Sequence, residues 1–120
     1  MRYNNGDIVV VRFPFALKNG SEIQKGRPAL VISDDKVKRR HNDVILAAIT
    51  SQVPYYIMEL EIVAGPGKGT GLLKKSLVRL DFIMTIPENM ISRKIGQLPD
   101  DMLRKAESRI KKSLAIKEHE

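Results

Sequence analysis

Short apolar runs rich in β-branched residues alternate with polar segments along most of the chain. Residues 8–13 follow a Gly-Asp turn and stop before Pro14, and similar runs occupy residues 28–33, 43–51, 55–63 and 76–86. Residues of this type, in runs of this length, favour β-strands. The pattern predicts five or more short strands.

The last part of the chain follows a different period. Leu103, Ala106, Ile110 and Leu114 recur at helical spacing, and two aspartates occupy positions 100–101, where the helix dipole favours acidic groups. We therefore expect a C-terminal amphipathic helix over about residues 100–116. Strands followed by one helix predict a mainly β fold, a small and strongly bent sheet or barrel with the helix packed on it.

The connecting segments are polar or glycine-rich. Residues 16–26 are predicted to form a long polar loop, and residues 34–42 form a basic one. The glycine-rich segment at residues 65–71 is predicted to be a β connection, because a phosphate-binding loop needs Lys-Ser/Thr after its glycines and then a helix. In the run 76–86, the period of two puts Arg79 and Asp81 on one face and Val78, Leu80 and Phe82 on the other.

Length and charge narrow the class of protein. A chain of 120 residues fits one domain covering 1–120, with the strand core at about 7–98. The formal net charge of +7 favours a polyanionic partner, with nucleic acid first and an acidic protein second. With no cysteine, no signal-like N-terminus and no run of membrane-spanning length, the expected location is the cytoplasm, without membrane contact.

Arg27 and Thr50 are the leading candidates for chemistry. Each stands at one end of a predicted strand, Arg27 before residues 28–33 and Thr50 near the end of residues 43–51. Two strands can present both groups at one spot. A guanidinium matches phosphate geometry at two points, so an arginine and a hydroxyl without neighbouring metal ligands suit a phosphodiester.

Six segments, taken in order, resemble the MazF/PemK (Kid) family of bacterial toxins. Any one of them is weak alone, whereas six in the right order form a specific signal across nearly the whole chain. They are NGDIV (5–9), GSE (20–22), KGRPALVIS (25–33), ITS (49–51), SLVRLD (76–81) and IGQL (95–98).

The resemblance implies an SH3-like barrel that dimerises and acts as the toxin of a type II toxin-antitoxin system. It implies a sequence-specific endoribonuclease that cuts single-stranded mRNA without a metal or other cofactor. The products would be a 2′,3′-cyclic phosphate or 3′-phosphate and a 5′-hydroxyl, and translation and growth would stop. The implied inhibitor is a cognate antitoxin with an acidic C-terminal segment.

The resemblance also assigns site residues. Arg27 and Thr50 match the catalytic pair of the MazF branch, whereas Arg79 and Asp81 match the acid and base pair of the Kid branch. Glu22 matches the glutamate of the first loop. Further substrate contacts are expected from Ser21, Lys25, Lys36, Arg39, Ser51, Gln52, Ser76 and Arg79.

The choice of general base stays open at this point. Metal-free cleavage of RNA needs a group that removes the 2′-hydroxyl proton, and either Glu22 or Asp81 could serve. The first loop lacks the histidine of the Kid pattern, His41 lies in the basic loop, and His119 stands beside the C-terminus. Two isolated histidines cannot make a metal site.

Two other functions remain possible from the sequence. A gyrase poison of the CcdB type would share the fold but grip a topoisomerase. A catalytically silent RNA- or protein-binding barrel would keep the basic groove and tolerate loss of Arg27 and Thr50. The intact Arg-Pro and Thr-Ser motifs disfavour the gyrase poison. The silent barrel stays open and is tested by whether Arg27→Ala abolishes toxicity while RNA is still bound.

Overall fold

The computed structural model describes residues 3–16 and 22–117, apart from the side chains of residues 13–16 and 22–25. Six strands form one antiparallel sheet in the order β4-β5-β3-β2-β1-β6, and one helix follows them. The elements are β1 (Asp7–Ala16), β2 (Glu22–Val31), β3 (Asp43–Thr50), β4 (Glu61–Ala64), β5 (Ser76–Pro87), the 3-10 turn η1 (Glu88–Met90), β6 (Ile91–Gln97) and α1 (Asp100–Ser113).

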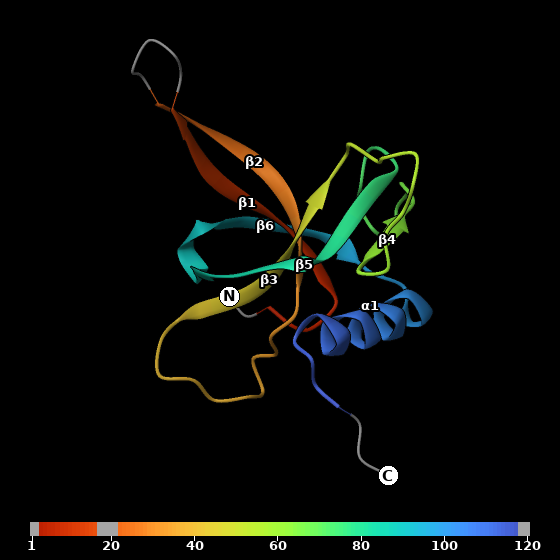
Figure 1. Ribbon diagram of the computed structural model, residues 1–120. Coiled ribbons are helices and arrows are strands. Elements are labelled where there is room, and N and C mark those ends of the chain that lie inside the picture. The colour runs from red at the N-terminus through yellow and green to blue at the C-terminus, as the bar shows by residue number, and fades with distance from the viewer. Residues whose placement is uncertain (1–2, 17–21, 118–120) are drawn as a thin grey trace.

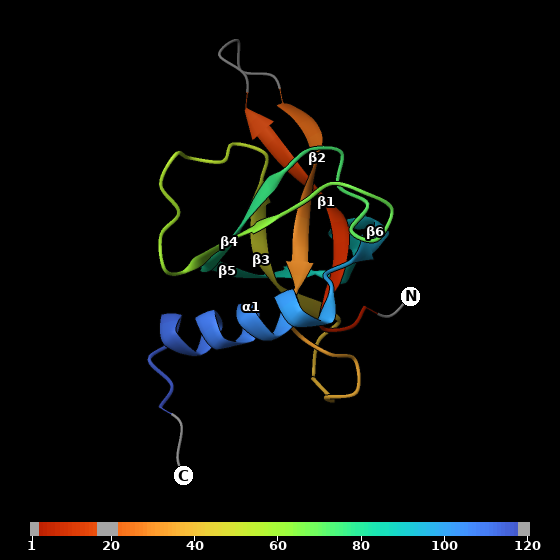
Figure 2. The same cartoon turned by 90° about the vertical axis from the view of Figure 1, so that its right-hand side faces the viewer.

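The fold is mainly β with a single helix, as the sequence predicted. The sheet is strongly bent but not closed, since β4 and β6 form its two edges. The sheet therefore does not close into the barrel that the family resemblance implied. The loop between β4 and β5 crosses toward β6 instead, where the Gln97 N–H donates to the Gly69 carbonyl at 2.9 Å (Figure 2).

The first hairpin differs from the expectation. Instead of a strand ending at Phe13 and a loop over residues 16–26, β1 continues to Ala16 and β2 begins at Glu22 (Figure 1). The pairing runs without a break from Ile8 opposite Leu30 to Ala16 opposite Glu22. Proline interrupts only the hydrogen bond that its own N–H would make, so one proline does not end a strand whose neighbours pair.

Two other boundaries also move. Residues 55–60 lie outside any strand, and only Glu61–Ala64 pair with β5. The helix ends at Ser113, and Leu114 is 56% exposed rather than packed. Helical spacing alone does not show where a helix leaves the surface that it covers.

Two apolar cores lie on the two faces of the bent sheet. One packs beneath α1 and includes Ile8, Leu30, Val78, Leu80 and Ala106, all at most 1% exposed. The other lies inside the bend. Its buried members are Tyr3, Val9, Val11, Ala29, Val31, Val44, Leu46, Ile86 and Ile91.

A buried carboxylate ties the N-terminal segment to β6. Asp7 is 2% exposed and accepts hydrogen bonds from the Asn4 N–H at 2.9 Å and from Gln97 Nε2 at 3.2 Å. The ammonium of Lys94 lies 3.1 Å from the same carboxylate. A buried charge needs such partners, and here they join the start of β1 to the last strand.

Candidate active site

Arg27 and Thr50 lie on the same face of the sheet, on neighbouring strands. β2 and β3 pair antiparallel with Ala29 opposite Ala48, and β3 pairs with β5 so that Ala48 is opposite Arg79. Arg27 stands two residues before Ala29 and Thr50 two residues after Ala48. Continuing the register therefore sets Arg27 opposite Thr50, both on the face that carries Arg79.

The pairing of β2 with β3 stops just before these two residues. It covers Val31, Leu30 and Ala29 only, whereas β2 goes on pairing with β1 and β3 goes on pairing with β5 to Thr50. The two strands thus diverge beyond Ala29. This point of divergence, flanked by Arg27 and Thr50, is called the opening below. Arg27 is exposed and Thr50 half-buried at this opening, so both can reach a ligand from solvent.

The hydroxyl of Thr50 is oriented by its own turn. Its Oγ1 accepts a hydrogen bond from the Gln52 N–H at 3.1 Å, just after the strand ends. A hydroxyl can accept and donate at once. With the acceptor side engaged by the backbone, the O–H hydrogen of Thr50 is available to donate to an oxygen placed in the opening.

Arg79 and Asp81 form a two-point ion pair beside the opening. Arg79 Nε donates to Asp81 Oδ1 at 3.3 Å, and Nη2 donates to Oδ2 at 3.0 Å. The guanidinium carbon also lies 5.3 Å from the centre of the Phe82 ring, within the range of a cation–π contact. Arg79 is therefore held in place by its own strand.

This ion pair changes the proton affinity of both partners. The hydrogen bond from Arg79 lowers the pKa of Asp81 below its usual range, against a smaller opposing effect of burial. The same hydrogen bond raises the pKa of Arg79. Asp81 is consequently ionised near neutral pH but is a weaker base than an ordinary carboxylate.

The position of Phe82 corrects the prediction from the period of two. A β-bulge interrupts β5, since Ala47 is opposite Ile83 and the next residue, Ala48, is opposite Arg79. The extra residues of the bulge shift the alternation. Val78 and Leu80 remain buried, but Phe82 is 44% exposed and its ring lies by Arg79.

The serine and glutamine candidates divide between the opening and the core. Ser51 and Gln52 are exposed immediately after Thr50. Ser76 is 3% exposed and its hydroxyl donates to the Lys74 carbonyl at 2.9 Å, so it holds the loop before β5 rather than facing the opening.

The candidates of the first hairpin can be placed only in part. Ser21 lies outside the described residues. Glu22 and Lys25 belong to β2, opposite Ala16 and Phe13, and their side chains also lie outside the described part.

The structure does not bring Lys36 and Arg39 to the opening within one chain. Both lie in the loop before Asp43, where β3 begins, whereas Thr50 ends the same strand. The strand has eight residues, so at ~3.3 Å per residue its ends are about 23 Å apart.

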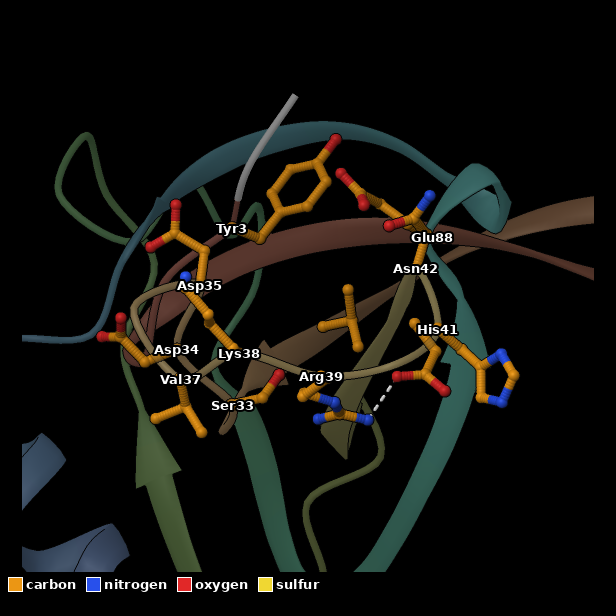
Figure 3. Close-up of a pocket in the computed structure, with 12 residues that line it drawn as sticks. Tyr3, Ser33, Asp34, Asp35, Val37, Lys38, Arg39, His41, Asn42 and Glu88 are labelled. Atoms are coloured by element: carbon orange, nitrogen blue, oxygen red, sulfur yellow. Dashed lines mark hydrogen bonds and ion pairs between the residues drawn. The ribbon is translucent and has the colours of Figure 1, made fainter.

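That loop borders a separate cavity of about 370 Å³ (Figure 3). There the guanidinium of Arg39 forms an ion pair with Asp43, and the Lys36 N–H donates to Asp34 Oδ1 at 2.9 Å. Tyr3 closes one side, and burial raises the pKa of its phenol, aided by Glu88 and Asp7. The cavity mixes carboxylates with cations. Its lining is Tyr3, Ser33, Asp34, Asp35, Val37, Lys38, Arg39, His41, Asn42, Asp43, Val44 and Glu88.

The sequence did not single out two neighbours of the site. Phe82 stacks on Arg79, and Glu61 stands opposite Arg79 on β4, where it accepts the Met58 N–H at 2.8 Å. The bulge and the pairing of β4 with β5 bring them there. Neither feature leaves a signal in the local pattern of residues.

Within residues 3–16 and 22–117, no group of three His, Cys, Asp or Glu side chains is placed to hold a metal ion. In the same described ranges, no helix has the length and apolar character needed to cross a membrane.

The sequence and the fold match known proteins. The model of the family described as "PemK-like, MazF-like toxin of type II toxin-antitoxin system" matches residues 4–114. The chain is 33% identical over 97 residues to endoribonuclease EndoA of Bacillus subtilis, covering 81% of this chain and 83% of that protein. It is 28% identical over 90 residues to a probable endoribonuclease MazF of Mycolicibacterium smegmatis, covering 74% and 81%.

Solved structures share the fold. The crystal structure of MazE-MazF from Deinococcus radiodurans superposes with a TM-score of 0.76 at 19% identity and covers 98% of this chain and 99% of that one. A mycobacterial endoribonuclease in complex with its cognate antitoxin gives 0.74 at 15% identity, with 98% and 99% covered. The chain belongs to the PemK-like, MazF-like toxins of type II toxin-antitoxin systems. The resemblance read from the six segments is confirmed.

Proposed function

We propose that this toxin is an endoribonuclease that cuts single-stranded mRNA at the opening between β2 and β3. The observation that carries the proposal is the register that sets Arg27 opposite Thr50 where the two strands separate. Its curated relatives are named endoribonucleases, which supports the same activity here. Inhibition of translation and growth would follow from loss of mRNA.

Arg27 and Thr50 would divide the work on the phosphate. The guanidinium of Arg27 offers two parallel N–H donors to the non-bridging oxygens, where negative charge grows in the phosphorane transition state. The Thr50 hydroxyl, oriented by the Gln52 N–H, donates to one of the same oxygens. Arg27 is a poor proton donor because an arginine guanidinium holds its proton tightly, so its role is electrostatic.

The bond changes follow from the chemistry of RNA. The 2′-oxygen attacks phosphorus, loses its proton to a base and forms a new P–O bond. The bond to the 5′-oxygen breaks, and that oxygen takes up a proton. The products are a 2′,3′-cyclic phosphate, which can open to a 3′-phosphate, and a 5′-hydroxyl. No metal or other cofactor is needed for these steps.

The candidates for the base are Glu22 and Asp81. The hydrogen bonds from Arg79 weaken Asp81 as a base, because they lower its pKa. We assign Asp81 first to holding Arg79 beside the opening, with Arg79 as a second phosphate contact. Glu22 is then the preferred proton acceptor, and Ser21, Lys25, Ser51, Gln52, Lys36 and Arg39 stay proposed substrate contacts.

The wider biological setting is also proposed. The chain would act as a single domain over residues 1–120, as a homodimer, in the cytoplasm and away from membranes. An antitoxin with an acidic C-terminal segment would cover the RNA site, since the net charge of +7 favours an acidic tail that orders on binding. Structural neighbours include toxins solved with their antitoxins, which supports such a partner.

The decisive experiment is cleavage of a long single-stranded RNA by the purified protein in excess EDTA, with both fragment ends mapped. Wild-type protein is expected to make discrete cuts that persist in the chelator and leave 5′-hydroxyl ends. Arg27→Ala and Thr50→Ala are expected to abolish the cuts. A DNA strand of the same sequence should survive, since it lacks the 2′-hydroxyl.

Uncut RNA from folded, antitoxin-free wild-type protein would overturn the proposal. Cuts that need a divalent metal would overturn the metal-independent chemistry. Cuts that persist in both variants would show that the catalytic site does not include Arg27 and Thr50. Arg104→Ala, on the exposed side of α1, is the control for loss of one positive charge away from the opening.

A further inference from the structure

A second cavity, of about 440 Å³, adjoins the opening from the other side of the sheet. It includes Gly26 and Pro28, which flank Arg27 along β2, and Ser51, which follows Thr50. Because successive residues of a strand face opposite sides, this cavity lies behind the face of Arg27 and Thr50. β3 ends at Thr50, and the next residue, Ser51, lines the cavity.

The cavity combines apolar walls with a cationic rim. Its volume falls within the ~300–1,000 Å³ of ordinary small-molecule sites. Among the residues that the structure describes, its polar side chains are two cations and two hydroxyls, and none is a carboxylate. The lining is Val10, Gly26, Pro28, Ser51, Gly71, Leu72, Leu73, Lys74, Ser76, Arg93 and Ile95.

The two cations stand on elements that pack tightly together. Lys74 belongs to the loop between β4 and β5, and Arg93 belongs to β6, opposite Val10 of β1. That loop lies directly on β6 (Figure 2), since a side chain at Gly71 would come within 2.1 Å of the Ile95 carbonyl oxygen. The Ser76 hydroxyl, bonded to the Lys74 carbonyl, also holds the loop.

Neither cation is neutralised by a neighbouring carboxylate. Among the residues that the structure describes, ion pairs engage Arg39, Arg79, Lys94 and Lys112, but not Lys74 or Arg93. Lys94, next to Arg93 on β6, is paired with buried Asp7. Lys74 and Arg93 therefore keep their charge available at the rim of a cavity whose described lining has no acidic side chain.

We propose that this cavity is a subsite for the nucleotide that flanks the cleaved bond, with its phosphate held by Arg93 and Lys74. The inference rests on the proposed cleavage at Arg27 and Thr50 and extends it to a second phosphate. The apolar wall of Val10, Pro28 and Leu72 faces the rest of that nucleotide. The bound strand passes around the end of β3, from Thr50 past Ser51 to the rim.

The test removes one phosphate charge at a time. Binding is measured with the slow Thr50→Val protein on a short RNA whose 2′-hydroxyl at the mapped cut site is replaced by hydrogen, so that the RNA stays uncut. A series of such RNAs carries a neutral methylphosphonate at each successive position. The same series is repeated with Arg93→Ala/Lys74→Ala added and, as the matched control, with Arg104→Ala/Lys105→Ala on the exposed side of α1.

At one flanking position, the methylphosphonate is expected to weaken RNA binding by the Thr50→Val protein and by the control protein. It should no longer weaken binding by the protein that also carries Arg93→Ala/Lys74→Ala. In the cleaving enzyme, the same double change should raise KM by about tenfold or more, since hydrogen bonds to charged groups are lost, with a much smaller change in kcat. The slope of log affinity against log salt should fall by about 0.7, the value for one phosphate contact on a single strand.

The failures are distinguishable. If wild-type protein cuts RNA but the test and control proteins show the same sensitive positions and the same KM, the subsite is wrong and the nuclease proposal stands. If wild-type protein does not cut, the nuclease proposal fails. The subsite is then tested separately, by comparing the binding of methylphosphonate-substituted single-stranded RNAs of random sequence to the proteins with and without Arg93→Ala/Lys74→Ala. Equal sensitivity there would overturn the subsite as well. Thermal unfolding of all variants confirms that they are folded.

Discussion

Arg79 donates two hydrogen bonds to Asp81, two residues further along β5, at 3.3 and 3.0 Å. The contact is local in sequence, yet it determines the protonation state of a candidate general base. It keeps Asp81 ionised and at the same time makes it a weak proton acceptor. The pair therefore has consequences for both stability and catalysis.

The first prediction concerns stability against pH. The pKa of Asp81 is lower in the folded chain than the unfolded value of ~3.9, so its stabilising effect is present above that pH and is lost as the pH falls through the folded value. Both side chains are more than a third exposed, so the effect should not exceed about 1 kcal/mol. Urea unfolding should show Asp81→Asn slightly less stable than wild type at pH 7, and the difference should be smaller at pH 2. A difference that is the same at both pH values would mean that packing, rather than charge, is responsible.

The second prediction separates the charge of Arg27 from its shape. Arg27→Lys keeps the positive charge but loses the planar fork of donors that matches a phosphate. Single-turnover cleavage should fall on the order of 10²-fold, as for loss of one oriented donor in a transition state. Binding of uncut RNA should change far less. Near wild-type cleavage by the lysine variant would mean that Arg27 contributes only its positive charge and not its planar fork of donors.

The third prediction uses two substitutions of Thr50 with opposite outcomes. Thr50→Ser keeps the hydroxyl that accepts the Gln52 N–H, so cleavage should stay within about tenfold of wild type. Thr50→Val keeps the shape and removes the hydroxyl, and the single-turnover rate should fall by about 10²-fold. Similar rates for the two proteins would exclude a hydrogen-bonding role for this side chain.

The fourth prediction tests how the loop between β4 and β5 is held on β6. Gly71 has φ +73°, and an added Cβ would lie 2.1 Å from the Ile95 carbonyl oxygen. Gly71→Ala should therefore cost about 2 to 5 kcal/mol of unfolding free energy, from backbone strain and overpacking together. Gly65→Ala is the control, since nothing lies within 4 Å of its added Cβ, and it should change stability by less than about 0.5 kcal/mol. Equal melting temperatures for the two variants would contradict the tight packing.

The residues that the sequence identified fall into two groups. Arg27 and Thr50 could be proposed because each stands at the end of a recognisable apolar run, and the register of β2 with β3, continued by two residues, sets them on one face. Lys36 and Arg39 could not be placed, because nothing in their basic loop shows at which end of the sheet it lies. The structure puts them at the start of β3, about one strand length from Thr50.

The cavity behind the opening could not be predicted from the sequence. Lys74 and Arg93 are 19 positions apart and read as ordinary surface cations. They line one cavity only because the loop between β4 and β5 packs on β6 and the pairing of β2 with β3 ends early. Such contacts depend on how distant segments meet.

The sequence by itself determined the mainly β class, the C-terminal helix and the family, and it proposed Arg27 and Thr50 as site residues. These features rest on local periodicity and on motifs, which are properties of neighbouring residues along the chain. The tertiary structure alone decided that the sheet stays open, that a bulge turns Phe82 toward Arg79, and that β2 and β3 separate where Arg27 faces Thr50. Strand register and strand separation depend on pairing between distant segments, and no local pattern encodes that pairing.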